Sequence, residues 1–396
     1  MSGGVRVAVM PDSFGGTLDA VEAAAAIGAG WHAGRPEDTV VLAPQSDGGP
    51  GFIEVLATAF GGEVRTQTVT GPLGEPVRAS WLLHSGVGYI EVAQACGLHL
   101  LGGDPDPGTA VAATTAGVGD LISAALLARC RTIVVGLGGS SSTDGGRGAS
   151  ERLGGCGAAR RLLADVDLIV ATDVDNPLLG EHGAARVFGP QKGADPATVA
   201  RLEQRLADWA EQLAVECGVD VADTPGAGAA GGLGAALLAW GGRRVSGAAL
   251  VAEQTGRLAK IADADLVITG EGRLDSQTLR GKLVAVVAAE AHRAGVPVMV
   301  FAGQSTLPVR VLPDLGEVHS LVHHAGSIEE ALGQAGPRLT ELAAEVAAAW
   351  AGPAAPGAAG QPLAENGAGE PDAGEPDAGD RDDEETGAGE KYTVGE

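Results

Sequence analysis

Basic and aromatic residues are both scarce in this sequence of 396 residues. Its 26 lysines and arginines stand against 51 aspartates and glutamates, which gives a formal net charge of -25, and 3% of the residues are aromatic. A charge of this sign repels phosphate polymers and anionic membrane surfaces. Few aromatic rings also leave little for nucleic-acid bases to stack on. We therefore expect neither nucleic acid nor a membrane as a partner.

Cysteine is rare too, and long hydrophobic runs are missing. The four cysteines lie far apart without a CxxC pair, a pattern that suggests neither a zinc site nor a disulfide framework. No segment approaches the roughly 18 apolar residues of a membrane span, and residues 1–10 lack the basic and apolar regions of a signal peptide. These features predict a soluble, cytoplasmic protein.

Residues 352–396 are set apart from the rest by their composition. They include 12 acidic and 2 basic residues, few apolar ones and the repeat GEPDAGEPDAG. Such a segment cannot bury enough apolar surface to offset the entropy of ordering, so we predict a disordered, solvating tail. A tail that binds a partner is the alternative.

The remaining chain is rich in hydrophobic residues and glycine, and it alternates helical segments with short apolar runs. Polar loops follow the runs, as in TIVVGLGGSSSTDGG, DLIVATDVDNP and ADLVITGEGRLD. Helix and strand in alternation predict a parallel α/β sheet, which binds ligands at the carboxyl ends of its strands. The stretch 64–96 instead suggests antiparallel hairpins.

We therefore expect an α/β protein, in which a Rossmann-like parallel sheet domain is interrupted by a second, smaller α/β domain. Its length is sufficient for two domains of roughly 100–200 residues each. The expected core comprises residues 1–62, 110–180 and 247–350, the inserted domain comprises a β-rich part at 63–109 and a glycine-rich part at 181–246, and the tail spans 352–396.

The loop GLGGSSSTDGG, which begins at Gly136, is chemically suited to an anion. It offers flexible backbone N–H groups and four hydroxyls at a strand end. A dinucleotide fingerprint would need glycine at Ser141, and the Gly281-Lys282 pair lacks the other residues of a Walker A loop. The loop is predicted to hold nucleotide phosphate, and the alternative is a turn whose hydroxyls cap a helix. The residues predicted to bind nucleotide are Gly138, Gly139, Ser140 and Ser141.

Carboxylates gather in the loop TDVDNP. Asp173 and Asp175 would lie on one side of an extended segment, where they could hold magnesium or accept a proton from a hydroxyl. An Asx-turn before Pro177 is the alternative. The loop PDSFGGTL, between an apolar run and a helix, places Asp12 and Ser13 where they could orient a small polar ligand.

Eight motifs in this order resemble the bacterial glycerate kinase type I family. They are PDSFGGTL, SDGGPG, GPLGEPV, GLGGSSSTDGG, ATDVDNPLLG, VFGPQKGA, PGAGAAGGLGAALL and VITGEGRLDSQTLRGK. The resemblance covers residues 5–305 and extends to about residue 345. It implies a two-domain kinase that uses ATP and Mg²⁺ to phosphorylate D-glycerate to 2-phosphoglycerate, or to phosphorylate a similar small hydroxy acid.

Phosphoryl transfer requires positioning and charge neutralisation more than covalent chemistry, so carboxylates, a cation and N–H donors are expected together. With the resemblance, we assign roles to the residues in the matching motifs. The assigned residues are Asp173, Lys192 and Asp47 as catalytic, Asp12, Ser13 and Asp275 as substrate-binding, and Asp173, Asp175 and Asp144 as metal ligands.

The sequence departs from the family pattern in three loops. The family usually has lysine where Gly15 stands, glutamate and threonine where Pro50 and Phe52 stand, and asparagine where Thr143 stands, and it is longer between residues 153 and 167. An alternative is therefore a non-catalytic relative that binds nucleotide or acid in a regulatory role. An NAD-dependent oxidoreductase is a more distant alternative, and a homo-oligomer is left open.

Overall fold

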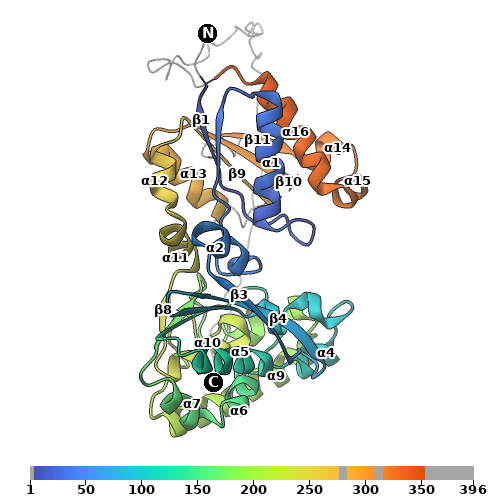
Figure 1. The fold of residues 1–396 in the computed structure, drawn as a ribbon. Coiled ribbons are helices and arrows are strands. Elements are labelled where there is room, and N and C mark those ends of the chain that lie inside the picture. Colours follow the sequence, from blue (N-terminus) through green and yellow to red (C-terminus); the bar gives the residue numbers. More distant parts are fainter. Residues whose placement is uncertain (1–3, 276–282, 308–314, 353–396) are drawn as a thin grey trace, which may run out of the picture. The chain divides into compact units, whose positions relative to one another are not determined.

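The computed structural model describes residues 4–275, 283–307 and 315–352 (Figure 1). The predicted tail beyond Gly352 and the Gly281-Lys282 pair lie outside the described residues. Two sheets organise the described chain, one of five strands and one of six. Their order along the chain confirms an α/β fold in which a parallel sheet is interrupted by an inserted region.

The first sheet is parallel, with the strand order β11-β10-β9-β1-β2. Alternation along β1 produces two buried faces, because Val7 and Val9 point to one side while Ala8 and Met10 point to the other. Helices α1 and α16 cover the first face and α13 covers the second (Figure 1). The strands are β1 (Arg6–Val9), β2 (Thr39–Leu42), β9 (Leu266–Leu274), β10 (Val298–Ser305) and β11 (Glu317–Ser320). The helices of this part are α1 (Ala20–Gly34), α12 (Arg257–Ala262), α13 (Leu283–Arg293), α14 (Leu321–Ala325), α15 (Ile328–Gly333) and α16 (Ala335–Ala349).

Helices α1 and α16 pack closely because glycine lies at their contact. A Cβ atom on Gly30 would stand 2.2 Å from the carbonyl oxygen of Thr340, and one on Gly34 would stand 2.4 Å from that of Ala344. The amino end of α1 is closed by a capping box, in which Asp19 and Glu22 each bond the other's backbone N–H. Local capping and close packing therefore fix the helix that follows the PDSFGGTL loop.

The second sheet is mixed, with the order β3-β4-β5-β6-β7-β8. Strands β3, β4 and β5 pair antiparallel, which confirms the expected hairpins, and β5 to β8 pair parallel. The strands are β3 (Glu63–Thr70), β4 (Pro76–His84), β5 (Val87–Glu91), β6 (Thr132–Gly136), β7 (Asp167–Ala171) and β8 (Arg243–Val245). The α-helices of this region are α2 (Phe52–Phe60), α3 (Ala93–Cys96), α4 (Pro107–Ala112), α5 (Ala116–Leu127), α6 (Arg147–Arg152), α7 (Cys156–Leu162), α8 (Ala184–Phe188), α9 (Pro196–Cys217), α10 (Leu233–Ala239) and α11 (Gly247–Thr255). Three 3-10 turns are η1 (Leu98–Leu101), η2 (Pro190–Lys192) and η3 (Ala229–Gly232).

The sheet topology corrects one part of our expected partition. We assigned residues 110–180 to the Rossmann-like core, but β6 and β7 pair with β5 and β8 and so belong to the inserted sheet. Both sheets contain strand–helix–strand units, and the local alternation of helix and strand does not say which sheet a strand joins. The inserted sheet is therefore larger than expected, and the domain boundaries stay a prediction.

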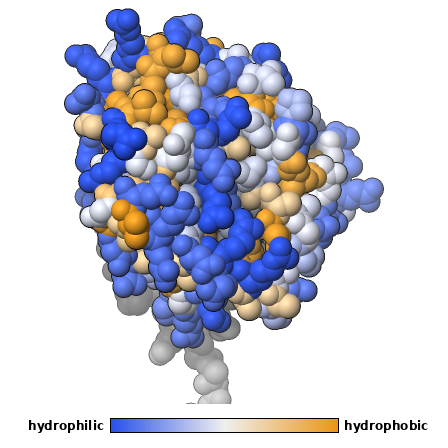
Figure 2. All heavy atoms as spheres, turned by 90° about the horizontal axis from the view of Figure 1, so that it is seen from below, coloured by the Kyte–Doolittle hydropathy of each residue, from blue (hydrophilic) through white to orange (hydrophobic). Residues whose placement is uncertain are grey.

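The surface carries mixed polar and apolar side chains. Figure 2 shows one face on which hydrophilic residues surround several separate hydrophobic patches. All four cysteines are buried free thiols. Within the described ranges, no helix has both the length and the hydropathy that crossing a membrane requires.

Candidate functional site

Two loops that follow strands of different sheets meet backbone to backbone. The N–H of Gly138, after β6, donates to the carbonyl of Gly48, after β2, at 3.3 Å. A Cβ on Gly138 would lie 2.3 Å from the Cα of Gly49, so this contact requires glycine. The contact brings Asp47 of SDGGPG beside the glycine-serine loop GLGGSSSTDGG.

A pocket of about 170 Å³ opens at this meeting point, and we call it the central pocket. Its lining comes from loops that the sequence analysis treated separately. Among the predicted site residues it contains Asp47, Gly138, Gly139, Ser140, Asp173 and Lys192. The structure therefore brings together six residues that are up to 145 positions apart in the chain (192 minus 47).

Lys192 provides the cation of the central pocket. Its side chain is buried, and its Nζ donates to the Ser140 hydroxyl at 3.0 Å and to the Ser142 carbonyl at 2.5 Å. Burial lowers the pKa of Lys192 to about 8, while the nearby thiol of Cys96 and carboxylate of Asp144 act in the opposite direction. The positive charge is thus fixed against the glycine-serine loop.

Asp144 has a different position from the one we predicted. Its buried carboxylate accepts hydrogen bonds from the N–H groups of Thr115, Gly146 and Gly148 at 2.9–3.0 Å, and from the Thr115 hydroxyl. Asp144 does not line the central pocket. These bonds hold the loop to the start of α6, so the geometry does not support the predicted metal role.

Ser141 also differs from its prediction as a nucleotide contact. Both its N–H and its hydroxyl donate to the carbonyl of Cys96, at 2.8 and 2.9 Å. The side chain is 1% exposed and lies outside the lining of the central pocket. Its donors are directed to the backbone of another segment, so we leave Ser141 out of the site.

The two carboxylates of TDVDNP have different partners. Asp173 accepts from the Ser246 hydroxyl at 2.5 Å and from the N–H of Ala248 at 3.0 Å, whereas Asp175 pairs with Arg244 at 2.6 Å. In the described ranges, no group of three or more acidic, histidine or cysteine residues could hold a metal ion. The predicted set of three carboxylates is therefore not assembled around one point.

A second pocket of about 420 Å³, the loop pocket, lies at the ends of β1 and β9. Asp12, Ser13 and Asp47 line it, and Asp47 is shared with the central pocket. The loops are joined because Gly272 donates its N–H to the Ser13 carbonyl at 3.2 Å. The predicted Asp275 lies outside this lining, 3.6 Å from Arg273 across an ion pair.

Sequence reasoning missed Arg273 as a site residue and left Glu271 without a role. Both line the loop pocket, and they are two positions apart on β9. Alternate strand residues share a face, so the pattern GEGR after an apolar run could have indicated both. Glu271 is buried, whereas the Arg273 side chain is 65% exposed and can reach a ligand.

The turn η3 was missed as well. Ala229 and Ala230 line the central pocket, and Ala230 has a left-handed backbone with a φ of 50°. This conformation is costly for a residue with a Cβ. The motif PGAGAAGGLGAALL signals a glycine-rich turn, but nothing in its spacing indicates which residue faces a ligand.

A third hollow, of about 610 Å³, lies among α11, α12 and α13, and we call it the helix groove. Asp173 lines both the helix groove and the central pocket. The three spaces therefore form a series, in which Asp173 joins the groove to the central pocket and Asp47 joins the central pocket to the loop pocket. A series of this kind can hold two ligands end to end.

Known proteins are similar to this chain in sequence and in architecture. The profile of the glycerate kinase family matches residues 7–161 and 155–351. An uncharacterized protein of Mycobacterium bovis is 55% identical over 348 residues, which cover 87% of this chain and 91% of that protein. Glycerate 2-kinase of Escherichia coli is 39% identical over 375 residues, covering 87% of this chain and 97% of that protein.

A solved structure agrees with these sequence matches. The crystal structure of a protein assigned as glycerate kinase 2 from Salmonella typhimurium LT2 is 37% identical, has a TM-score of 0.71, and matches 87% of this chain and 98% of its own. The resemblance carried by the eight motifs is thereby confirmed. From the family profile, the relatives and the fold, we conclude that the chain belongs to the glycerate kinase family.

Proposed function

We propose that this protein is an ATP-dependent kinase that phosphorylates D-glycerate, yielding 2-phosphoglycerate, or phosphorylates a similar small hydroxy acid. One observation carries the proposal: the small central pocket is joined through one carboxylate to each of two larger spaces. A kinase needs such an arrangement because its donor and acceptor must approach the same phosphoryl group from opposite sides.

In this proposal the central pocket holds the transferring phosphoryl group. Gly138 and Gly139 line it with closely packed backbone, Ser140 provides a hydroxyl, and Lys192 provides a fixed positive charge. Donors that are already oriented toward developing charge stabilise the transition state without reorganising. The pocket's 170 Å³ suits a phosphoryl group rather than a whole nucleotide.

The loop pocket is the proposed place of the acid. Ser13 and Arg273 offer a hydroxyl and a guanidinium, which can bind a carboxylate, and Asp12 can accept a hydrogen bond from a hydroxyl. Asp47 lies at the boundary with the central pocket, where a general base would receive the proton of the attacking hydroxyl.

We propose magnesium alongside ATP, and the residues present fit that ion. Mg²⁺ commonly binds through one or two carboxylates together with substrate phosphates and water, so it does not need a cage of three protein ligands. Asp173 is the carboxylate of the central pocket that would hold it, together with phosphate oxygens and water. When bound, the ion would neutralise phosphate charge.

The test is an assay of phosphorylation with ATP and Mg²⁺ over a panel of small hydroxy acids, with D-glycerate included. We expect D-glycerate or a close analogue to be turned over. We also expect Lys192→Ala to lower kcat by roughly 100-fold or more with a smaller effect on KM, because its charge acts mainly in the transition state. Lys260→Ala, on α12, is the control and should retain wild-type turnover.

The alternative is a non-catalytic relative that binds nucleotide or acid. It is motivated by Gly15 in the loop pocket, where the family usually has lysine. Calorimetry that shows nucleotide or acid binding, with no turnover of any acid in the panel, would favour this alternative and contradict the kinase proposal.

A further inference from the structure

We propose that the helix groove binds the base and ribose of the nucleotide, with the phosphates directed past Asp173 into the central pocket. This inference rests on the proposed kinase function, but it concerns a surface that lies outside the eight motifs apart from Asp173. It assigns a ligand class to residues of α11, α12 and α13.

Size is the first argument. Ligand pockets that enclose most of a small molecule usually measure roughly 300–1,000 Å³. The helix groove, at about 610 Å³, lies in this range, and the central pocket, at about 170 Å³, lies below it. A nucleotide whose phosphates occupy the central pocket must therefore place its nucleoside in an adjoining space.

Continuity is the second argument. Asp173 lines both spaces, and its carboxylate is held at the amino end of α11 by Ser246 and Ala248. Because the two spaces share this residue as a wall, the phosphates of a nucleotide in the groove would pass Asp173 to reach the central pocket. The pocket beside β11, although its volume is about 710 Å³, shares no lining residue with the central pocket and offers no such path.

The walls of the groove suit a flat apolar ring. Ala248, Ala249 and Ala252 line the α11 side, and Val286 of α13 also lines the groove. Small side chains leave a smooth surface on which a planar heterocycle can lie. At the rim, Leu258 is 60% exposed, so apolar surface is available there for a ligand to cover.

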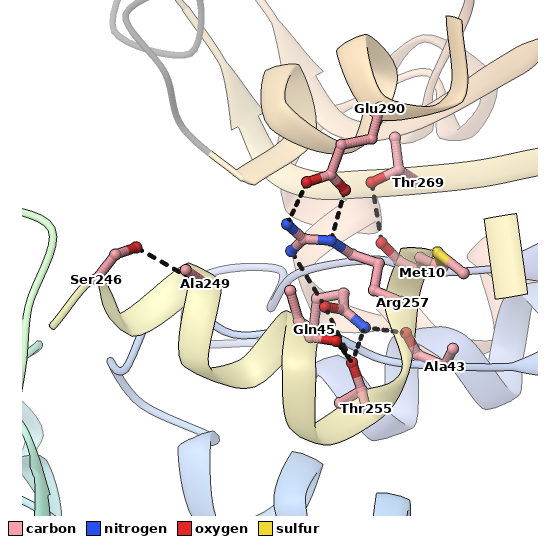
Figure 3. A network of polar contacts seen from close by, with 10 residues as sticks. Met10, Ala43, Gln45, Ser246, Ala249, Thr255, Arg257, Thr269 and Glu290 are labelled. Atoms are coloured by element: carbon pink, nitrogen blue, oxygen red, sulfur yellow. Dashed lines mark hydrogen bonds and ion pairs between the residues drawn. The ribbon is translucent and has the colours of Figure 1, made fainter. Parts of the chain in front are cut away.

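A polar pair lies at one side of these walls. Arg257, only 2% exposed, donates to Glu290 through Nε at 2.7 Å and Nη2 at 2.8 Å, and its Nη1 donates to Gln45 at 3.3 Å (Figure 3). Both residues of the pair line the groove. A carboxylate can accept from N–H groups of a base, and a guanidinium can donate to a ring nitrogen.

The network behind this pair makes its geometry rigid. Gln45 bonds in turn to the Ala43 carbonyl at 2.9 Å and to the Thr255 hydroxyl at 3.1 Å, as Figure 3 shows. Side chains held on several sides lose little freedom when a ligand binds. The exposed Glu253 of α11 is placed at the groove to accept hydrogen bonds from ribose hydroxyls.

The loop pocket is the competing location for the nucleoside. Its lining includes Asp12, Asp47 and Glu271, whose carboxylates suit hydroxyl groups or a cation better than an apolar ring. The helix groove also has three carboxylates, but Glu290 among them is paired with Arg257, and four alanines and Val286 form an apolar wall on which a ring can lie. We therefore assign the nucleoside to the groove and the acid to the loop pocket.

The experiment fills the groove and leaves the rest of the chain unchanged. Ala252→Trp places a ring where the base would lie, and Ala289→Trp, on the exposed side of α13 and outside the groove lining, is the matched control. By calorimetry with ADP, we expect the dissociation constant to be at least tenfold larger for Ala252→Trp and unchanged for Ala289→Trp. In steady-state kinetics the KM for ATP should rise while the KM for the acid stays constant.

A measurement on the unaltered protein covers the case in which Ala252→Trp does not fold. Photolabelling with 8-azido-ADP should modify peptides from residues 246–259 or 283–290. Labelling confined to residues 11–18 or 271–275 would place the base in the loop pocket and overturn the inference, as would unchanged ADP affinity in folded Ala252→Trp. If the groove is labelled but no acid is phosphorylated, the inference stands and the proposed kinase function fails.

Discussion

Lys192 holds its charge in a place that water hardly reaches, and this gives the protein a distinctive dependence on pH. Burial lowers its pKa from 10.5 to about 8, so the cation is present below pH 8 and is lost as the pH rises through it. We expect kcat/KM to fall above about pH 8, since the neutral amine cannot stabilise phosphoryl charge. A pH profile of kcat/KM between 6 and 10 measures this.

The same shift affects stability in the opposite direction. Between about pH 8 and 10.5 the unfolded chain binds a proton at Lys192 that the folded protein does not. The contribution of this group to the stability of the folded state therefore increases as the pH rises through this range. Circular dichroism recorded alongside the kinetics distinguishes titration from unfolding. An activity that stays constant up to pH 10 would refute the catalytic role of the buried charge.

Two aspartates near the glycine-serine loop should respond differently to substitution. Asp144→Ala leaves the buried N–H groups of Thr115, Gly146 and Gly148 without their acceptor, so the unfolding free energy should fall by about 3 kcal/mol. Asp173→Asn keeps the shape of a more exposed side chain, and turnover should fall by roughly 100-fold while the fold is retained. Urea unfolding and kinetics on both variants test the pair, and an Asp144→Ala protein of normal stability would contradict our assignment.

At the scale of elements, the packing of α1 on α16 depends on glycine at specific positions. A Cβ on Gly30 would stand 2.2 Å from a backbone oxygen of α16, whereas a Cβ on Gly336, within α16, would meet Leu18 at an ordinary 3.6 Å. We expect Gly30→Ala to lower the unfolding free energy by about 1–3 kcal/mol, because the helices must move apart.

Gly336→Ala is the matched control and should stabilise the protein by up to about 1 kcal/mol, because alanine is the better helix former and meets no clash. Urea denaturation of the two variants in parallel measures both effects. If both substitutions changed stability in the same direction, the close contact of α1 and α16 would not be the cause.

The elements also show what the sequence could predict. The strands at 132–136 and 266–274 follow from continuous apolar runs, and the loops after them follow from the concentration of glycine and polar residues. The sheet that each strand joins could not be predicted, because β6 pairs with β5 through backbone bonds that leave no mark on local composition.

The site shows the same division. The sequence could single out four residues that line the central pocket because each lies in a motif with unusual polar content, namely Asp47, Ser140, Asp173 and Lys192. The roles predicted for Asp144 and Ser141 have no support from their hydrogen bonds, since a sequence pattern cannot say whether a polar side chain faces a ligand or the protein's own backbone. The helix groove was missed because alanine is common in helices and carries no signal of a binding site. The groove exists only because α11, α12 and α13 pack beside one another.

For the molecule as a whole, the predicted tail accounts for a large part of the charge. Residues 353–396 carry 12 acidic and 2 basic residues, so a chain that ends at Gly352 has a net charge of -25 minus -10, or -15. We expect this shorter chain to keep its melting temperature and its turnover, because the tail's composition offers no apolar face for docking. Thermal melts and kinetics of both lengths measure this, and a clear loss of either would show that the tail contributes to the folded body.

The central position of β9 in the first sheet has a consequence for synthesis on the ribosome. β9 pairs directly with β1, but it begins at Leu266, 224 residues after β2 ends at Leu42. At roughly 5–20 residues per second, this interval lasts about 10–45 s. During that time the inserted sheet, complete at Val245, has all of its strands available. The second sheet can therefore fold first, and the growing chain must shield the apolar faces of β1 and β2 until their neighbour emerges.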